Sequence, residues 1–169
     1  MTTAMRMLIC LVASLAALAP AADEASPVKD EVIVAAAVDA ALLASLREAP
    51  RSVTVAGQTC TLDAYAWRDF MPGVEPDRFG LMVTVVARPG DGSAWLDSMA
   101  IDRIWVVHGD DVWEAPVGDE QRPEPANAIA RGGPRWAPGD RVTVVARITA
   151  ADGASALVRA AEATIDRTE

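Results

Sequence analysis

The hexapeptide Val-Thr-Val-Val-Ala-Arg occurs twice in this chain, at positions 83–88 and again at 142–147. Valine and threonine are β-branched and favour extended backbone. An Asp-Gly turn signal follows each copy, at 91–92 and at 152–153. The two copies predict two strands with the same pattern of side chains. An internal duplication would explain the repeat, and so would the independent origin of two simple valine-rich strands.

Similar short runs surround both copies, and glycine or proline separates them. We expect strands at 53–55, 59–67, 81–88, 101–107, 112–115, 142–149 and 155–165. Ala56-Gly57-Gln58 predicts a hairpin turn, whereas the region 118–140 is rich in proline and glycine and predicts a long connection. Strands that are spaced by turns, without helices between them, indicate a mainly β fold, either an antiparallel sandwich or a barrel.

The segment before these strands has a different character. Residues 30–48 are rich in alanine, and Val38, Leu42 and Leu46 recur at helical spacing, which predicts an N-terminal helix that ends before Pro50. The β-branched residues 32–34 could equally be extended.

The first 21 residues predict a secretory signal peptide. Arg6 precedes an apolar run at 7–18, and Ala19-Pro20-Ala21 provides the small residues that signal peptidase accepts. We therefore expect three parts: a signal peptide at 1–21, an N-terminal extension at 22–50 and a β-sandwich domain at 51–169. The mature protein would be periplasmic or secreted, with no membrane span after signal cleavage.

Cleavage would also remove Cys10 and leave Cys60 as a single cysteine. In an extended segment Cys60 and Leu62 share one face, and threonines occupy the other face. This alternation predicts a buried, unreactive thiol rather than a redox site.

The order of the segments resembles an immunoglobulin or fibronectin type III sandwich. Trp105 lies in the middle of a predicted strand, a tight turn and a second arm follow, and a proline-rich connection leads to a final hairpin. The stretches 67–72, 105–113 and 133–140 are similar to those of small exported bacterial proteins of unknown function. The resemblance implies an antiparallel immunoglobulin-like β-sandwich with a binding role, although the disulfide of true immunoglobulin domains has no counterpart here.

Few signs of catalysis are present. His108 is the single histidine and falls at a predicted hairpin turn, and the chain contains no nucleophile elbow, Walker loop or dinucleotide-binding motif. Acid pairs such as Asp110-Asp111 are typical of turns, and they lack the ligand number of a calcium loop. A net charge of −9 argues against binding to nucleic acid. We therefore predict no catalytic residues, no metal site and no cofactor.

Five of the eight aromatic residues are tryptophan. Trp67 and Trp105 are expected in the core, whereas Trp95, Trp113 and Trp136 lie near turn or proline signals and are candidate binding residues. The sequence thus predicts a non-enzymatic binding or assembly module that recognises a protein partner at the cell envelope. A carbohydrate-binding module with exposed tryptophans and a hydrolase or metal-dependent enzyme are the alternatives.

Overall fold

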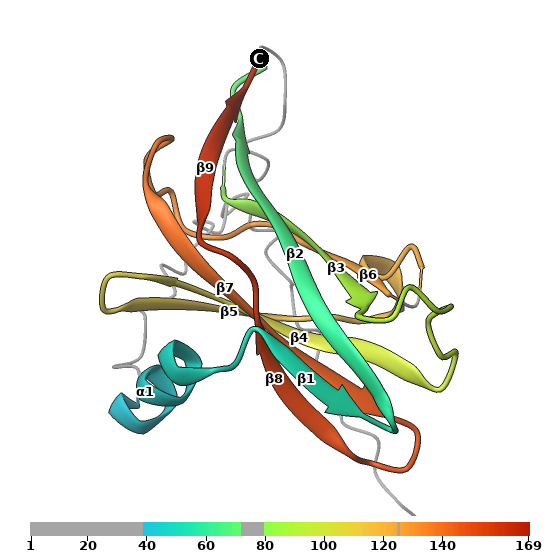
Figure 1. Cartoon of the computed structure of the whole chain (residues 1–169). Helices are drawn as coiled ribbons and strands as arrows, with labels where there is room; N and C mark the ends of the chain where they lie inside the picture. The colour runs from blue at the N-terminus through green and yellow to red at the C-terminus, as the bar shows by residue number, and fades with distance from the viewer. Residues whose placement is uncertain (1–38, 72–79, 125) are drawn as a thin grey trace, which may run out of the picture. The chain divides into compact units, whose positions relative to one another are not determined.

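The computed structural model describes residues 39–71, 80–124 and 126–169 (Figure 1). Within these residues, the helix α1 (Ala40–Glu48) precedes nine strands and the short 3₁₀ helix η2 (Asp119–Gln121). The strands are β1 (Ser52–Val55), β2 (Gln58–Asp69), β3 (Met82–Pro89), β4 (Met99–His108), β5 (Asp111–Pro116), β6 (Asn127–Ala130), β7 (Arg141–Ala150), β8 (Ser155–Arg159) and β9 (Ala163–Thr168). The predicted mainly β fold is confirmed.

The strands form one mixed sheet in the order β5-β4-β7-β9-β2-β3-β6, with β1 beside β2 and β8 beside β7. β9 pairs antiparallel with two residues of β7 and then parallel with residues 66–69 of β2. The expectation of a purely antiparallel arrangement is therefore wrong, because the last strand leaves β7 and continues beside β2 in the same direction as β2. The sheet curves almost into a barrel (Figure 1).

An immunoglobulin-like sandwich is not confirmed. In that fold the second and third strands belong to different sheets. Here β2 and β3 pair with each other over eight residues, from Cys60↔Pro89 to Trp67↔Met82.

The sequence placed most strands correctly but missed one. β6 lies within the region 118–140 that was expected to be only a connection, and the strand expected at 155–165 is divided into β8 and β9. The division has a physical role, because it lets β9 leave the edge of β7 and reach β2.

The core consists of the inward-facing side chains of the strands. In β2, Cys60, Leu62 and Ala66 are buried on alternate positions, as the period of two predicts. Cys60 is 0% exposed, which confirms its predicted burial. Burial and the neighbouring Asp91 carboxylate raise the pKa of the Cys60 thiol, so it is uncharged and unreactive at neutral pH.

Helix α1 covers part of the outer face of β4 and β7. Asp39 caps the helix by accepting a hydrogen bond from the Ala41 amide at 3.0 Å, and the helix ends before Pro50 as predicted. Leu46 packs there against Trp105 and Val145. The predicted signal peptide and the part of the predicted helix before residue 39 lie outside the described residues.

The two hexapeptides occupy β3 and β7, which lie in different parts of the sheet order. Both copies direct the first and second valines and the alanine inward. Their outer faces differ, because α1 buries Val145 in the β7 copy while the equivalent Val86 of β3 is partly exposed.

Candidate functional site

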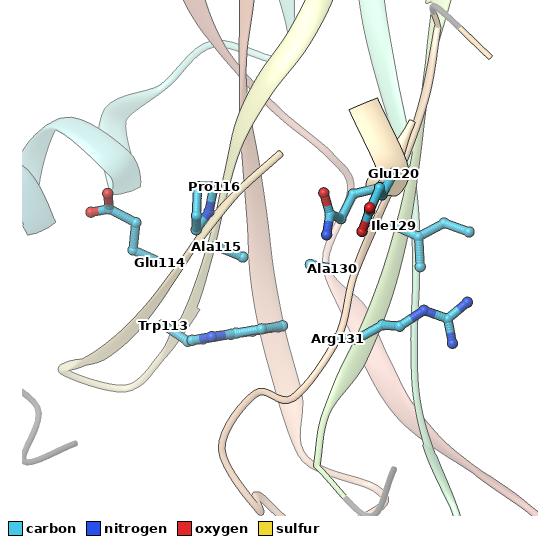
Figure 2. Close-up of a pocket in the computed structure, with 9 residues that line it drawn as sticks. Trp113, Glu114, Ala115, Pro116, Glu120, Ile129, Ala130 and Arg131 are labelled. Atoms are coloured by element: carbon cyan, nitrogen blue, oxygen red, sulfur yellow. The ribbon is translucent and has the colours of Figure 1, made fainter. Parts of the chain in front are cut away.

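The two ends of the sheet order, β5 and β6, face each other across a cavity of about 480 Å³ (Figure 2). Residues 113–116 of β5 line one side, and residues 129–131 at the end of β6 line the other. Glu120 and Gln121 of η2 complete the lining. Among the described residues, neither strand has a second partner strand on the side of this cavity.

Small side chains create the space. Ala115 and Ala130 face the interior from β5 and β6, and both are buried. Because strands alternate their faces, these alanines occupy positions where a larger residue would fill the gap. The indole of Trp113 extends from β5 into the space between the two strands (Figure 2).

Gly133 holds Trp113 in position. A Cβ atom on Gly133 would lie 2.7 Å from the indole carbons, so only glycine leaves room for the ring. The Gly133 amide donates to the Leu81 carbonyl at 3.0 Å, which extends the pairing of β3 with the segment after β6. The segment after β6, anchored on Leu81, therefore supports the indole ring that forms the apolar wall of the cavity.

The backbone of β6 has hydrogen-bonding groups that point toward the cavity. The Ala87 amide donates to the Ala126 carbonyl at 2.8 Å, which identifies this pair as hydrogen-bonded. Hydrogen-bonded pairs alternate with non-bonded pairs in an antiparallel ladder. Ala128 and Ala130 therefore bond to β3, whereas the N–H and C=O of Ile129 point away from β3, toward the side of the cavity.

The same alternation applies to β5. The Val117 amide donates to the Asp102 carbonyl at 3.0 Å, so Ala115 and Trp113 also bond to β4. The backbone N–H and C=O of Glu114 then point to the cavity side. Pro116, two residues later, has no N–H and offers a carbonyl alone.

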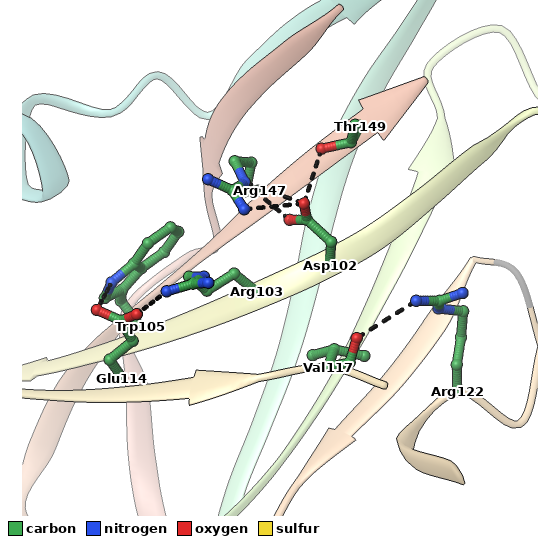
Figure 3. Close-up of polar contacts among 8 residues, drawn as sticks. All are labelled: Asp102, Arg103, Trp105, Glu114, Val117, Arg122, Arg147 and Thr149. Carbon is green, nitrogen blue, oxygen red and sulfur yellow. Dashed lines mark hydrogen bonds and ion pairs between the residues drawn. The ribbon is translucent and has the colours of Figure 1, made fainter. Parts of the chain in front are cut away.

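Side-chain contacts hold β5 against β4 (Figure 3). The carboxylate of Glu114 accepts a hydrogen bond from the Trp105 indole at 3.0 Å and forms an ion pair with Arg103. The Arg122 guanidinium donates to the Val117 carbonyl at 3.4 Å, which connects the chain after η2 to the end of β5. These contacts stiffen the wall of the cavity on the β5 side.

A second polar group in Figure 3 connects β4 to β7. Asp102 accepts hydrogen bonds from the Arg147 guanidinium at 2.8 Å and from the Thr149 hydroxyl at 3.0 Å. Partial burial raises the pKa of the Asp102 carboxyl, but the hydrogen bonds from Arg147 and Thr149 and the charge of Arg147 outweigh burial and leave that pKa lowered. Asp102 is therefore ionised at neutral pH and fixes the bulged part of β4 on β7.

The three candidate tryptophans do not share one face. Trp113 lines the cavity, and Gly133 brings the segment of Trp136 to the same end of the sheet. The Trp136 carbonyl accepts from Arg68 near the end of β2. Trp95 lies at the other end of β2, where its indole donates to the Met99 carbonyl at 3.0 Å. All three pack partly against the core, and their role in binding stays a prediction.

The two tryptophans expected in the core behave differently. Trp105 is 5% exposed, which confirms the prediction. The prediction for Trp67 is wrong, because the alternation of β2 places Ala66 inside and Trp67 on the outer face. There Trp67 stacks on Tyr65 with ring centroids 5.3 Å apart.

His108 ends β4 directly before the two-residue turn to β5, as the sequence predicted. Its Nε2 lies 3.4 Å from Asp140, and its ring lies against Trp136. Across the ranges that the structure describes, no group of three histidine, cysteine or acidic side chains is placed to hold a metal ion. No helix in these ranges has the length and hydropathy that a membrane crossing requires.

No protein-family model, curated protein or solved structure matches this chain. Trp113 was a candidate from the sequence alone, and the structure places it in the lining of the cavity. Ile129 and Ala130 were not candidates, because a four-residue strand between proline-rich loops gives almost no periodic signal, and Ala115 lies in a predicted strand where alanine carries no sign of a site.

Proposed function

We propose that this protein is a non-enzymatic binding module that takes up an extended segment of a partner protein between β5 and β6. The observation that carries this proposal is a cavity bordered on two sides by strand edges with backbone groups directed toward it. Extended peptides bind proteins by adding a strand to such an edge, where main-chain hydrogen bonds provide affinity. The signal-like residues 1–21 support a role for this module at the cell envelope.

Strand directions support the insertion of a single segment. Following the pairings around the sheet, β5 and β6 run in opposite directions. One inserted strand would therefore be antiparallel to one edge and parallel to the other. β9 pairs in this way between β7 and β2, so the fold already accommodates such a strand elsewhere.

The lining predicts which side chains the segment carries. Alternate residues of an added strand would point inward, toward Trp113, Ala115 and Ala130. These surfaces are apolar, so we expect apolar residues at every second position of the ligand and variable residues between them.

Proline at position 129 tests the backbone part of the proposal. Ile129→Pro removes an N–H that points away from β3, so the β3–β6 ladder stays intact and proline is tolerated on an edge strand. Peptides would be selected from a random twelve-residue display library on the purified chain, and their affinities measured by calorimetry. We expect binding to Ile129→Pro to be about tenfold weaker, since one hydrogen bond in a partly dry site is lost.

Ile129→Val is the matched control, because it retains the amide and most of the side chain. Far-UV circular dichroism of both variants checks that the sheet is unchanged. The proposal fails if no peptide is selected, or if selected peptides bind Ile129→Pro as tightly as the wild type.

A glycan-binding role has support on the outer face of β2 rather than at the three candidate tryptophans. Tyr65 is 48% exposed and stacks on Trp67 on the outer face of β2. Aromatic side chains with one apolar face and a polar tip suit ligands that are partly apolar and partly wet. Soluble cell-wall and plant polysaccharides that bind here would shift the tryptophan fluorescence of the wild type but not of Trp67→Ala, and no shift in the wild type would exclude this alternative.

A further inference from the structure

Three charged residues line the cavity between β5 and β6, and two of them turn away from it. The carboxylate of Glu114 is bound to Arg103 and Trp105 on the other side of β5, and Figure 2 shows it turned away from the cavity. The side chain of Arg131 also leads away, and its guanidinium lies 3.9 Å from the Met82 sulfur.

Glu120 is different. It lies on η2, its side chain is exposed, and it belongs to the lining of the cavity (Figure 2). It forms no ion pair with another residue in the described part of the chain. The charge that a bound segment would meet is therefore negative.

The whole chain adds to this local charge. With 24 acidic and 15 basic residues, its field attracts cations and repels acidic partners. Charged groups at the rim of an interface determine which partners approach and how they are oriented, more than they determine the final affinity.

We infer that the segment bound between β5 and β6 is basic, with a lysine or arginine placed to meet Glu120. This inference rests on the proposed function and specifies its partner. η2 lies in the chain between the end of β5 at Pro116 and the start of β6 at Asn127. The basic residue would therefore sit at this end of the segment, and the alternating apolar residues would continue toward Trp113.

The test starts from the peptides selected on the wild-type chain. Each is synthesised as selected and with its lysines and arginines replaced by glutamine, and its dissociation constant is measured at low and at moderate ionic strength. We expect the selected peptides to be enriched in basic residues and to bind Glu120→Gln about three- to tenfold more weakly than the wild type. The loss should shrink as salt rises, because the pair is at the rim.

Glu48→Gln is the matched control, since it removes the same charge from α1, which does not line the cavity. The inference is overturned if neutral or acidic peptides bind equally well, or if Glu120→Gln and Glu48→Gln have the same effect. In those cases the proposed function still stands, provided that binding depends on the amide of Ile129. If no peptide depends on that amide, both proposals fail.

Discussion

Strand β9 lies between β7 and β2 and pairs with both, whereas β5 and β6 are separated by a cavity. We call the first junction the closed seam and the second the open seam. Both are places where the sheet could end. The closed seam is completed by a strand of the chain itself, and at the open seam no strand among the described residues does this.

The side chains at the inward positions of the two seams also differ in size. The closed seam buries Ile165 beside Ala66, so a large aliphatic side chain fills the junction. The open seam places Ala115 and Ala130 at its inward positions. β5 and β6 are six and four residues long, and Pro116 ends one of them. Short edges with proline limit unspecific pairing between copies, so an open seam can persist without causing aggregation.

Truncation of Ile165 has the largest expected effect, because it empties the closed seam. Ile165 is 1% exposed, and Ile165→Ala should lower the free energy of unfolding by about 2–5 kcal/mol in urea denaturation. The comparison variant is Ile129→Ala at the open seam, where the side chain is only partly buried and a loss near 1 kcal/mol or less is expected. Equal losses would show that the two seams do not differ in packing.

A methyl group on Gly133 tests the open seam. Gly133→Ala would press on the indole of Trp113 and should cost about 1–3 kcal/mol of stability, with a shift in tryptophan emission and weaker binding of selected peptides. Gly90→Ala is the control, because its new Cβ would meet Thr59 at an ordinary contact distance of 3.6 Å. Unchanged emission in Gly133→Ala would mean that Trp113 is not fixed by this contact.

These two seams also separate what the sequence could predict from what it could not. Strands such as β3 and β7 were found because valine and threonine runs with adjacent turn signals are a local pattern. The parallel pairing of β9 with β2 was missed because it joins residues about 100 positions apart, and no local pattern encodes which distant strand becomes the neighbour.

The candidate site divides in the same way. Trp113 was a candidate because tryptophan is a rare residue and this one lies beside a turn. Gly133 lies 20 positions later, and its role is visible only in the structure, where it contacts the indole ring of Trp113. Trp67 was misplaced because neighbouring residues of a strand face opposite sides, and a shift of one residue exchanges core for surface. A cavity formed by two alanines has no sequence signature, since alanine is common throughout this chain.

The arginines that end the two hexapeptides provide a third test. Arg147 of β7 holds the partly buried Asp102, whereas Arg88 of β3 pairs with Asp63 where both side chains are exposed. Asp102→Asn should lower stability at neutral pH by about 1–3 kcal/mol, and Asp63→Asn by less than about 1 kcal/mol.

The pH dependence of stability tests the role of Asp102 further. The pKa of Asp102 is lower in the folded protein than in the unfolded chain. The ionised carboxylate therefore stabilises the fold fully at pH values above the pKa of the unfolded chain, and this stabilisation is lost as the pH falls through the pKa of the folded protein. Urea denaturation at a series of acidic pH values should therefore show wild type and Asp102→Asn converging in stability. A constant difference down to the lowest pH would contradict this assignment.

The smallest expected effect is a gain in stability at the hairpin of β1 and β2. This hairpin belongs to the same side of the sheet as the closed seam, and β1 lies near β8 there. Ala56 and Gly57 form its two-residue turn with positive φ angles of 46° and 81°. Such turns favour Asn-Gly, because alanine is strained in the left-handed region. Ala56→Asn should therefore raise the free energy of unfolding by about 0.5–1 kcal/mol in urea denaturation.

The control variant is Ala154→Asn, in the turn between β7 and β8 but outside the left-handed region, and it should give no gain in stability. Equal gains in both variants would indicate that asparagine acts through the unfolded chain, and the strain at Ala56 would then have no measurable cost.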